Sequence, residues 1–86
     1  MRPISAKVSN VQLELSNRFS ARAEVVVPDG IAFVELFDLP HGVQATNLSD
    51  VVPGTHELLL YGEGEPPFKV GDTLSARGFS RDELSD

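Results

Sequence analysis

The sequence predicts an all-β domain, and two patterns support that prediction. Apolar and polar residues alternate over most of the chain, which is the period of a strand with one buried face. Turn-forming residues separate these runs at 16–17, 28–30 and 53–54. No segment has the sustained period of a helix. We therefore expect residues 1–86 to form a single β domain.

The first strand is expected to run from Ile4 to Leu15 with an irregularity in its middle. Its apolar positions are two residues apart as far as Val8, and again from Val11 onward. The step of three residues between them would turn the second half of a regular strand inside out. We therefore predict a β-bulge or bend near residues 9–10, followed by the turn at 16–17.

The second strand has the clearest alternation in the chain. Its predicted buried face consists of Phe19, Ala21, Ala23, Val25 and Val27. A Pro-Asp-Gly turn follows at 28–30, because proline presets one dihedral angle and glycine accepts a positive φ. Residues 31–39 have apolar side chains at both odd and even positions, so both faces of a strand would be buried. This pattern predicts a central strand that pairs on either side. Three strands joined by tight turns predict a meander.

The remaining elements are shorter. Residues 43–54 are compatible with a short strand or with one helical turn, whereas 58–61 predict a strand covered on both faces. Paired prolines make 63–67 a loop, and 73–79 form the last strand. Five or six strands in a chain of this size predict a small closed barrel or a two-sheet sandwich. The polar, acidic residues 80–86 are expected to form a loose tail.

Two segments near the C-terminus carry a resemblance to a known fold. They are LLYG at residues 59–62 and FKVGDTLSARG at residues 68–78. A strand that ends in an aromatic-glycine pair, followed by Gly-Asp opening a strand that ends in glycine, resembles the closing hairpin of oligonucleotide/oligosaccharide-binding (OB) folds. The long, bent first strand is similar too. The resemblance implies a five-stranded barrel, closed by pairing of the first strand with residues 58–61.

Two other segments support a competing architecture. DGIAFVE at residues 29–35 and PGTHEL at residues 53–58 resemble recurring segments of bacterial immunoglobulin-like domains. This resemblance implies a β-sandwich, in which two sheets meet face to face. The sequence leaves the choice between barrel and sandwich open.

Composition narrows the classes of partner. The net charge of −6, from thirteen acidic and seven basic residues, disfavours non-specific binding to duplex DNA or to anionic membranes. The absence of cysteine excludes disulfides and thiolate metal sites. The first residues have no apolar core of signal-peptide length, and no apolar run is long enough to cross a membrane, so we expect a cytoplasmic protein.

The sequence offers no recognisable catalytic group. His41 and His56 are the only histidines, and their spacing matches no metal-binding motif. No serine lies in a nucleophile-elbow context, and the glycines form no phosphate-binding loop. Carboxylate pairs such as Glu35 with Asp38 are interpreted as solvated surface acids. We therefore expect no enzyme activity, no cofactor and no metal.

A binding surface is the remaining candidate. Its predicted members are Arg18, Arg22, Tyr61, Lys69, Arg77 and Phe79. On an OB-type barrel they would line a groove for single-stranded nucleic acid, which is bound by base stacking and a basic track. Alternatively they are surface residues paired with acids, such as Arg22 with Glu24 or Glu14. Because only seven residues are basic, the sequence favours another protein as partner, through an exposed β edge or an acidic surface. The identity of the partner and the oligomeric state stay open.

Overall fold

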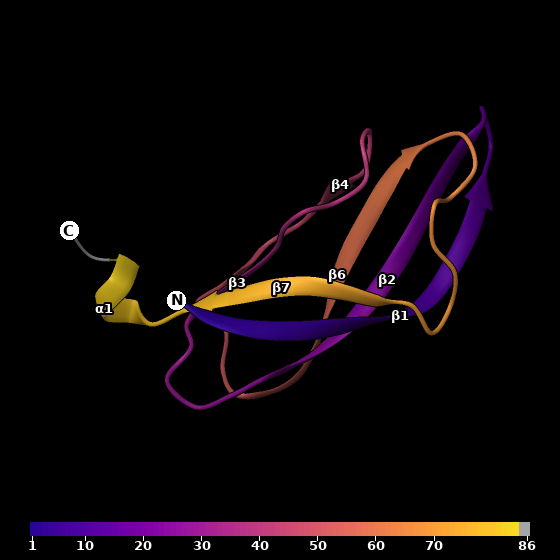
Figure 1. Cartoon of the computed structure of the whole chain (residues 1–86). Helices are drawn as coiled ribbons and strands as arrows, with labels where there is room; N and C mark the ends of the chain where they lie inside the picture. Colours follow the sequence, from indigo (N-terminus) through magenta and orange to yellow (C-terminus); the bar gives the residue numbers. More distant parts are fainter. Residues whose placement is uncertain (85–86) are drawn as a thin grey trace.

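The computed structural model describes residues 1–84, which form one curled antiparallel sheet and a final helical turn (Figure 1). The strands are β1 (Arg2–Glu14), β2 (Arg18–Val27), β3 (Phe33–Leu36), β4 (Gln44–Ala45), β5 (Leu48–Ser49), β6 (Gly54–Glu63) and β7 (Thr73–Phe79). Their spatial order is β4-β6-β2-β1-β7-β3-β5. The predicted all-β class is confirmed, and the last strand lies where it was predicted. The sheet has seven strands rather than five or six.

β1 is the longest strand, and it joins the two halves of the sheet. It pairs with β7 as far as Lys7, and with β2 from Ala6 to Glu14. The ladder to β2 shifts register between Val8 and Asn10, which confirms the predicted bulge. This extra residue returns the apolar side chains of the second half to the inner face of the sheet.

The hairpin between β1 and β2 also forms as predicted. Ser16 and Asn17 have φ angles of 63° and 57°. Glu14 pairs with Arg18, so the loop has three residues, and its last two adopt the left-handed conformation that tight hairpin loops use. The predicted buried face of β2 is confirmed as well, because all five of its residues are at most 3% exposed.

The third strand departs from the prediction. β3 comprises only four residues, and it pairs with β7 and β5 rather than with β2. The predicted meander is therefore wrong after the first hairpin, because both edges of β2 are already paired with β1 and β6. β3 is paired on both sides as expected, but only one of its faces is covered. Val34 and Leu36 are buried, whereas Phe33 and Glu35 are partly exposed.

A short extended segment, the closing segment (residues 44–51), connects the two edges of the sheet. Its β4 part pairs with β6 and its β5 part pairs with β3, with only two residues between them. The Thr46 N–H donates to the Leu59 carbonyl at 2.9 Å, and the Val51 N–H donates to the Ala32 carbonyl at 3.1 Å. The residues predicted as either strand or helical turn therefore form short strands, and they give the sheet its barrel-like curl.

Neither of the two predicted strand arrangements is formed by residues 1–84. β1 pairs with β2 and β7, whereas residues 58–61 lie in β6, which pairs with β2 and β4. The expected OB-type closure between the first strand and residues 58–61 is thus replaced by closure through the closing segment. All seven strands belong to one sheet, so the two facing sheets of a sandwich are not formed either.

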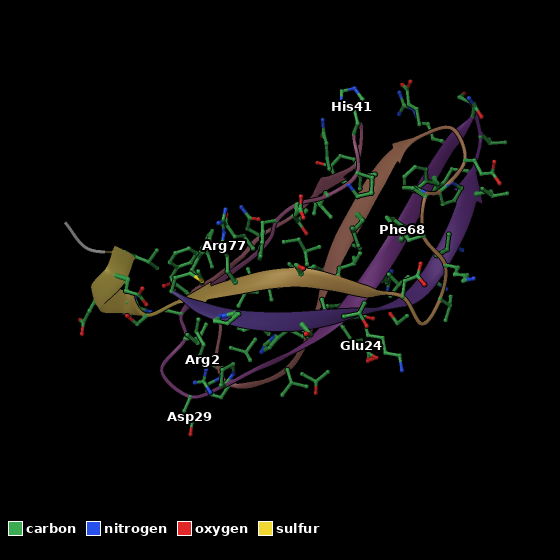
Figure 2. The ribbon with its side chains drawn as sticks, viewed as in Figure 1. Arg2, Glu24, Asp29, His41, Phe68 and Arg77 are labelled. Carbon is green, nitrogen blue, oxygen red and sulfur yellow. The ribbon has the colours of Figure 1, made fainter. Side chains whose placement is uncertain are left out.

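The core lies inside the curl and is apolar throughout. Leu58 and Leu60 of β6 are fully buried, but Leu59 and Tyr61 are 46% and 45% exposed, so β6 is covered on one face rather than two. Phe68, from the loop between β6 and β7, packs edge-on against Phe19 with ring centroids 5.7 Å apart. Figure 2 shows Phe68 near the end of the sheet where β1 meets its hairpin. In residues 1–84 no polar or charged side chain is fully buried.

A single helical turn, α1 (Arg81–Leu84), follows the last strand. It begins with a capping box, in which the Glu83 N–H donates to the Ser80 hydroxyl and the Ser80 N–H donates to the Glu83 carboxylate. The Met1 ammonium also bonds to Glu83, and Arg81 pairs with Asp50 at 3.0 Å. The loose tail predicted for 80–86 thus includes four helical residues, while 85–86 lie outside the described residues. Within residues 1–84 no helix has the length and apolar character needed to span a membrane.

Gly62 provides a test of the packing around Phe19 in the core. A Cβ atom at Gly62 would lie 2.7 Å from the Phe19 ring and 3.0 Å from the Gly42 carbonyl oxygen. Gly62→Ala should therefore lower the free energy of unfolding by about 1–2 kcal/mol, because neither a packed ring nor a backbone oxygen moves freely. Gly78→Ala should cost less, since the two groups that its Cβ would meet within 3.0 Å, Ile4 Cδ1 and Ile31 Cγ2, are aliphatic methyls and not backbone. Urea denaturation measures both, and an equal or reversed order would contradict this account.

The N-terminal contact predicts a pH dependence. Hydrogen bonding to the Met1 ammonium, and then to Ser80, lowers the pKa of Glu83 from 4.5 to about 2. A carboxyl whose pKa falls on folding favours the native contact above its unfolded pKa, and loses that advantage as pH falls through the folded value. The contact should therefore persist at pH 4 and weaken towards pH 2. NMR titration of the Glu83 carboxyl carbon tests this, and N-terminal acetylation should raise the midpoint. A midpoint near 4.5 in the unmodified protein would refute it.

Candidate functional site

The six predicted binding residues do not share one groove. All of them are at least partly exposed, but they are distributed over four parts of the molecule. Arg18 and Tyr61 line one cavity, Arg22 lies farther along β2, and Arg77 and Phe79 lie on β7. Lys69 belongs to the loop between β6 and β7. Each location provides a different chemical environment.

Arg18 and Tyr61 are the pair that the structure brings together. They line an open cavity of about 750 Å³ at the hairpin end of β2 and β6. The strand register places Arg18 opposite Glu14 on one side and Glu63 on the other. A phosphate approaching this arginine would therefore meet two carboxylates, which weakens the cavity as a site for an anion.

Arg22 has a partner on the neighbouring strand. Its guanidinium lies 3.6 Å from the Glu57 carboxylate of β6, rather than beside Glu14 or Glu24. Glu24 instead lies opposite Lys7 of β1 in the strand register. Both side chains of the Arg22–Glu57 pair are about half exposed, so the pair contributes little to stability. Arg22 is thus a surface residue paired with an acid, as one interpretation of the sequence held, but the acid is Glu57 rather than Glu24 or Glu14.

Arg77 is the most constrained of the predicted residues. Its Nε atom donates to the Glu35 carboxylate at 2.7 Å, and its guanidinium carbon lies 4.8 Å from the centre of the Phe37 ring. Beside this pair, Phe79 packs against Phe33 with centroids 5.9 Å apart. Arg77 and Phe79 thus belong to a small cluster on the outer face of β3 and β7, where their polar and aromatic surfaces are already in contact.

Arg22 and Arg77 both face outward, but they are far apart along the sheet. In the register with β1, Arg22 lies opposite Asn10 and Arg77 lies opposite Pro3. Seven residues of a strand correspond to roughly 20 Å. Figure 2 shows Arg77 towards the α1 end of the sheet, away from Phe68. A continuous basic track across these two arginines is therefore not present in residues 1–84.

An open strand edge is the feature that the sequence analysis did not locate. The ladder between β1 and β7 ends at Lys7, and the last bonds on that side join Val8 to Gly71 and Asp72. The ladder to β2 continues to Glu14. On the side away from β2, the backbone of residues 10–14 has no hydrogen-bonding partner within the described chain. We call this stretch the open edge of β1.

A groove lies beside the open edge. It has a volume of about 800 Å³, and its walls are the second half of β1 and the loop between β6 and β7. The residues that line it are Val11, Leu13, Glu65, Pro66, Pro67, Phe68, Lys69 and Asp72. Leu13 is 77% exposed here, and Leu15 in the adjacent turn is 90% exposed. A groove with both apolar and charged lining residues, beside unpaired backbone, is suited to an extended peptide segment.

The histidines lie apart from this groove. His41 is exposed at the tip of the connection between β3 and β4 (Figure 2). The His56 Nε2 atom donates to the Val52 carbonyl at 2.7 Å. Among residues 1–84 no group of three histidine, aspartate or glutamate side chains is placed to hold a metal ion.

The contacts of Arg77 predict that it contributes more to stability than Arg22. Arg77→Ala removes both a short, partly buried ion pair and a cation–π contact, and should lower the free energy of unfolding by about 1–2 kcal/mol. Arg22→Ala removes one exposed pair and should cost no more than about 0.5 kcal/mol. Chemical denaturation of the two variants measures the difference. Equal losses would show that the cluster around Arg77 is not stabilising.

Comparison with known proteins places the chain in no family. No protein-family model, no curated protein and no solved structure matches it. Conclusions about its function therefore depend on the geometry of its own residues.

Proposed function

We propose that this protein is a non-enzymatic binding module that joins another polypeptide through the open edge of β1. The observation that carries the proposal is the unequal pairing of β1, which leaves residues 10–14 bonded to β2 on one side only. An extended segment of the partner would add to this edge as a further antiparallel or parallel strand. Backbone hydrogen bonds would supply affinity, and side chains in the groove would supply specificity.

The composition of the open edge supports this role. Proteins commonly protect an exposed edge with lysine, proline or a covering loop, because unpaired N–H and C=O groups attract other strands. The stretch Asn-Val-Gln-Leu-Glu at residues 10–14 contains neither lysine nor proline. Its one charge is Glu14, at the end next to the turn. The strand itself thus carries no lysine or proline that would block pairing, and the loop with Pro66 and Lys69 forms the far wall of the groove beside it.

The exposure of apolar side chains supports it as well. Leu13 and Leu15 are large aliphatic residues that remain mostly exposed at the hairpin end, where Pro66 and Phe68 line the opposite wall of the groove. Burying such surface is favourable by about 25 cal/mol per Å² of apolar area. A partner strand with apolar residues on its inward face would cover these side chains.

The distribution of charge supports a protein rather than single-stranded nucleic acid as the partner. The OB-type alternative needs basic and aromatic side chains along one face. Arg22 and Arg77 each have a carboxylate partner, and Arg18 lies between two acids in the strand register. Nucleic acid would have to displace or neutralise these carboxylates, whereas strand addition requires no basic surface.

Leu13→Lys tests the proposal. Leu13 is mostly exposed, so the variant should fold, while the ammonium group would place a charge in the groove and oppose any added strand. We expect it to abolish capture of the polypeptide that the unmodified protein retains from its native cell extract. Ser75→Lys adds the same charge on the outer face of β7, which is paired on both sides, and should retain the partner. Equal capture by Leu13→Lys and the unmodified protein would refute binding at this edge.

A further inference from the structure

We infer that the strand which adds to the open edge of β1 is β1 of a second copy of this chain. The inference rests on the proposed function and names the partner of the same edge. In this arrangement two β1 strands run antiparallel across a two-fold axis at Gln12, and the sheets of the two copies become continuous. A two-fold axis requires the edge to be complementary to itself, which its sequence allows.

The residue pairs across such an axis are chemically compatible. Asn10 would lie opposite Glu14 of the other copy, so an amide faces a carboxylate. Val11 would lie opposite Leu13, so two apolar side chains meet on the inner face. Gln12 would lie opposite its own equivalent, and two amides can bond to each other. No two like charges lie opposite one another, which is the main electrostatic requirement for cross-strand pairs.

Other antiparallel registers pair the residues of the open edge less favourably. A shift by one residue would place Gln12 opposite Leu13, which puts a polar and an apolar residue on the same face. An axis at Leu13 would extend the pairing into the turn, where Ser16 has a positive φ that a strand cannot continue. An axis at Val11 would extend it into the bulge between Val8 and Asn10. The axis at Gln12 is the register that uses residues 10–14 and no others.

The groove beside the edge would receive apolar residues of the second copy. Val11 and Leu13 of the first copy already line it, together with Pro66 and Phe68 of the loop. In an extended sheet, residues directly opposite point to the same face, so Val11 and Leu13 of the added strand would face the same groove. Pairing would thus cover Leu13, which is 77% exposed in the single chain.

The salt dependence of binding would distinguish a second copy of this chain from a basic partner. Each copy has a net charge of −6, so two copies repel each other at long range. Salt screens that repulsion and leaves the hydrogen bonds and apolar contacts in place, so the dimer should become stronger as salt is added. A basic partner bound to the acidic surface would dissociate under the same change. The short edge also predicts a weak dimer that forms reversibly with concentration.

Sedimentation velocity with the purified chain, from low micromolar to millimolar concentration and in low and high salt, tests the inference. We expect a monomer–dimer equilibrium that high salt strengthens. Gln12→Lys places two ammonium groups on the axis and should weaken the dimer by about two- to fivefold, and Gln12→Glu should do the same with carboxylates. An equimolar mixture of the two variants should recover dimers, because opposite charges then meet. Ser75→Lys should behave as the unmodified protein does.

Two results would overturn the inference. One is a monomer at every concentration and salt, and the other is a dimer that neither Gln12 variant weakens and that their mixture does not restore. The proposed function fails separately, when Leu13→Lys retains the captured partner. A monomeric protein whose partner is lost with Leu13→Lys would keep the edge as a binding site and identify a different polypeptide as its occupant. Amide hydrogen exchange at residues 10–14, slowed with rising protein concentration, would locate a dimer at this edge.

Discussion

β1 is held by β7 along its first half and by β2 along its second half, with only Ala6 and Lys7 paired to both. The bulge between Val8 and Asn10 makes this possible, because it bends the strand and keeps Val11 on the same face as Val8. The two halves of the sheet are therefore joined through one strand. The curl of the sheet, the core and the open edge all depend on β1.

Closure of the curl depends on much weaker contacts. The closing segment contributes two residues to each of its two ladders, with a few further bonds such as that between Thr46 and Leu59. What keeps this segment in place is the core behind it, where Leu60 and Val34 are fully buried next to its pairing positions. Gly62 shows how close this packing is, since a methyl group there would meet Phe19 and Gly42 at once.

Several charged residues of the outer surface form ion pairs within the chain. Arg77 bonds to Glu35 and lies over Phe37, Arg22 is near Glu57, and Arg81 pairs with Asp50. The backbone of residues 10–14 of β1 has no hydrogen-bonding partner on the side away from β2. For this reason a function based on strand addition fits the molecule better than one based on a charged site. Such a function requires no converging catalytic groups.

The sequence by itself determined the local features of this protein. Alternation identified the buried face of β2, the parity step located the bulge at residues 9–10, and Ser16 with Asn17 marked the hairpin turn, because each depends on neighbours within a few residues. Tertiary structure decided which strands meet. β3 pairs with β7 rather than β2, and the basic residues separate onto different surfaces, because register and order depend on contacts between distant segments. The open edge of β1 follows from the register that places Thr73, the first residue of β7, opposite Lys7, and no local pattern encodes that register.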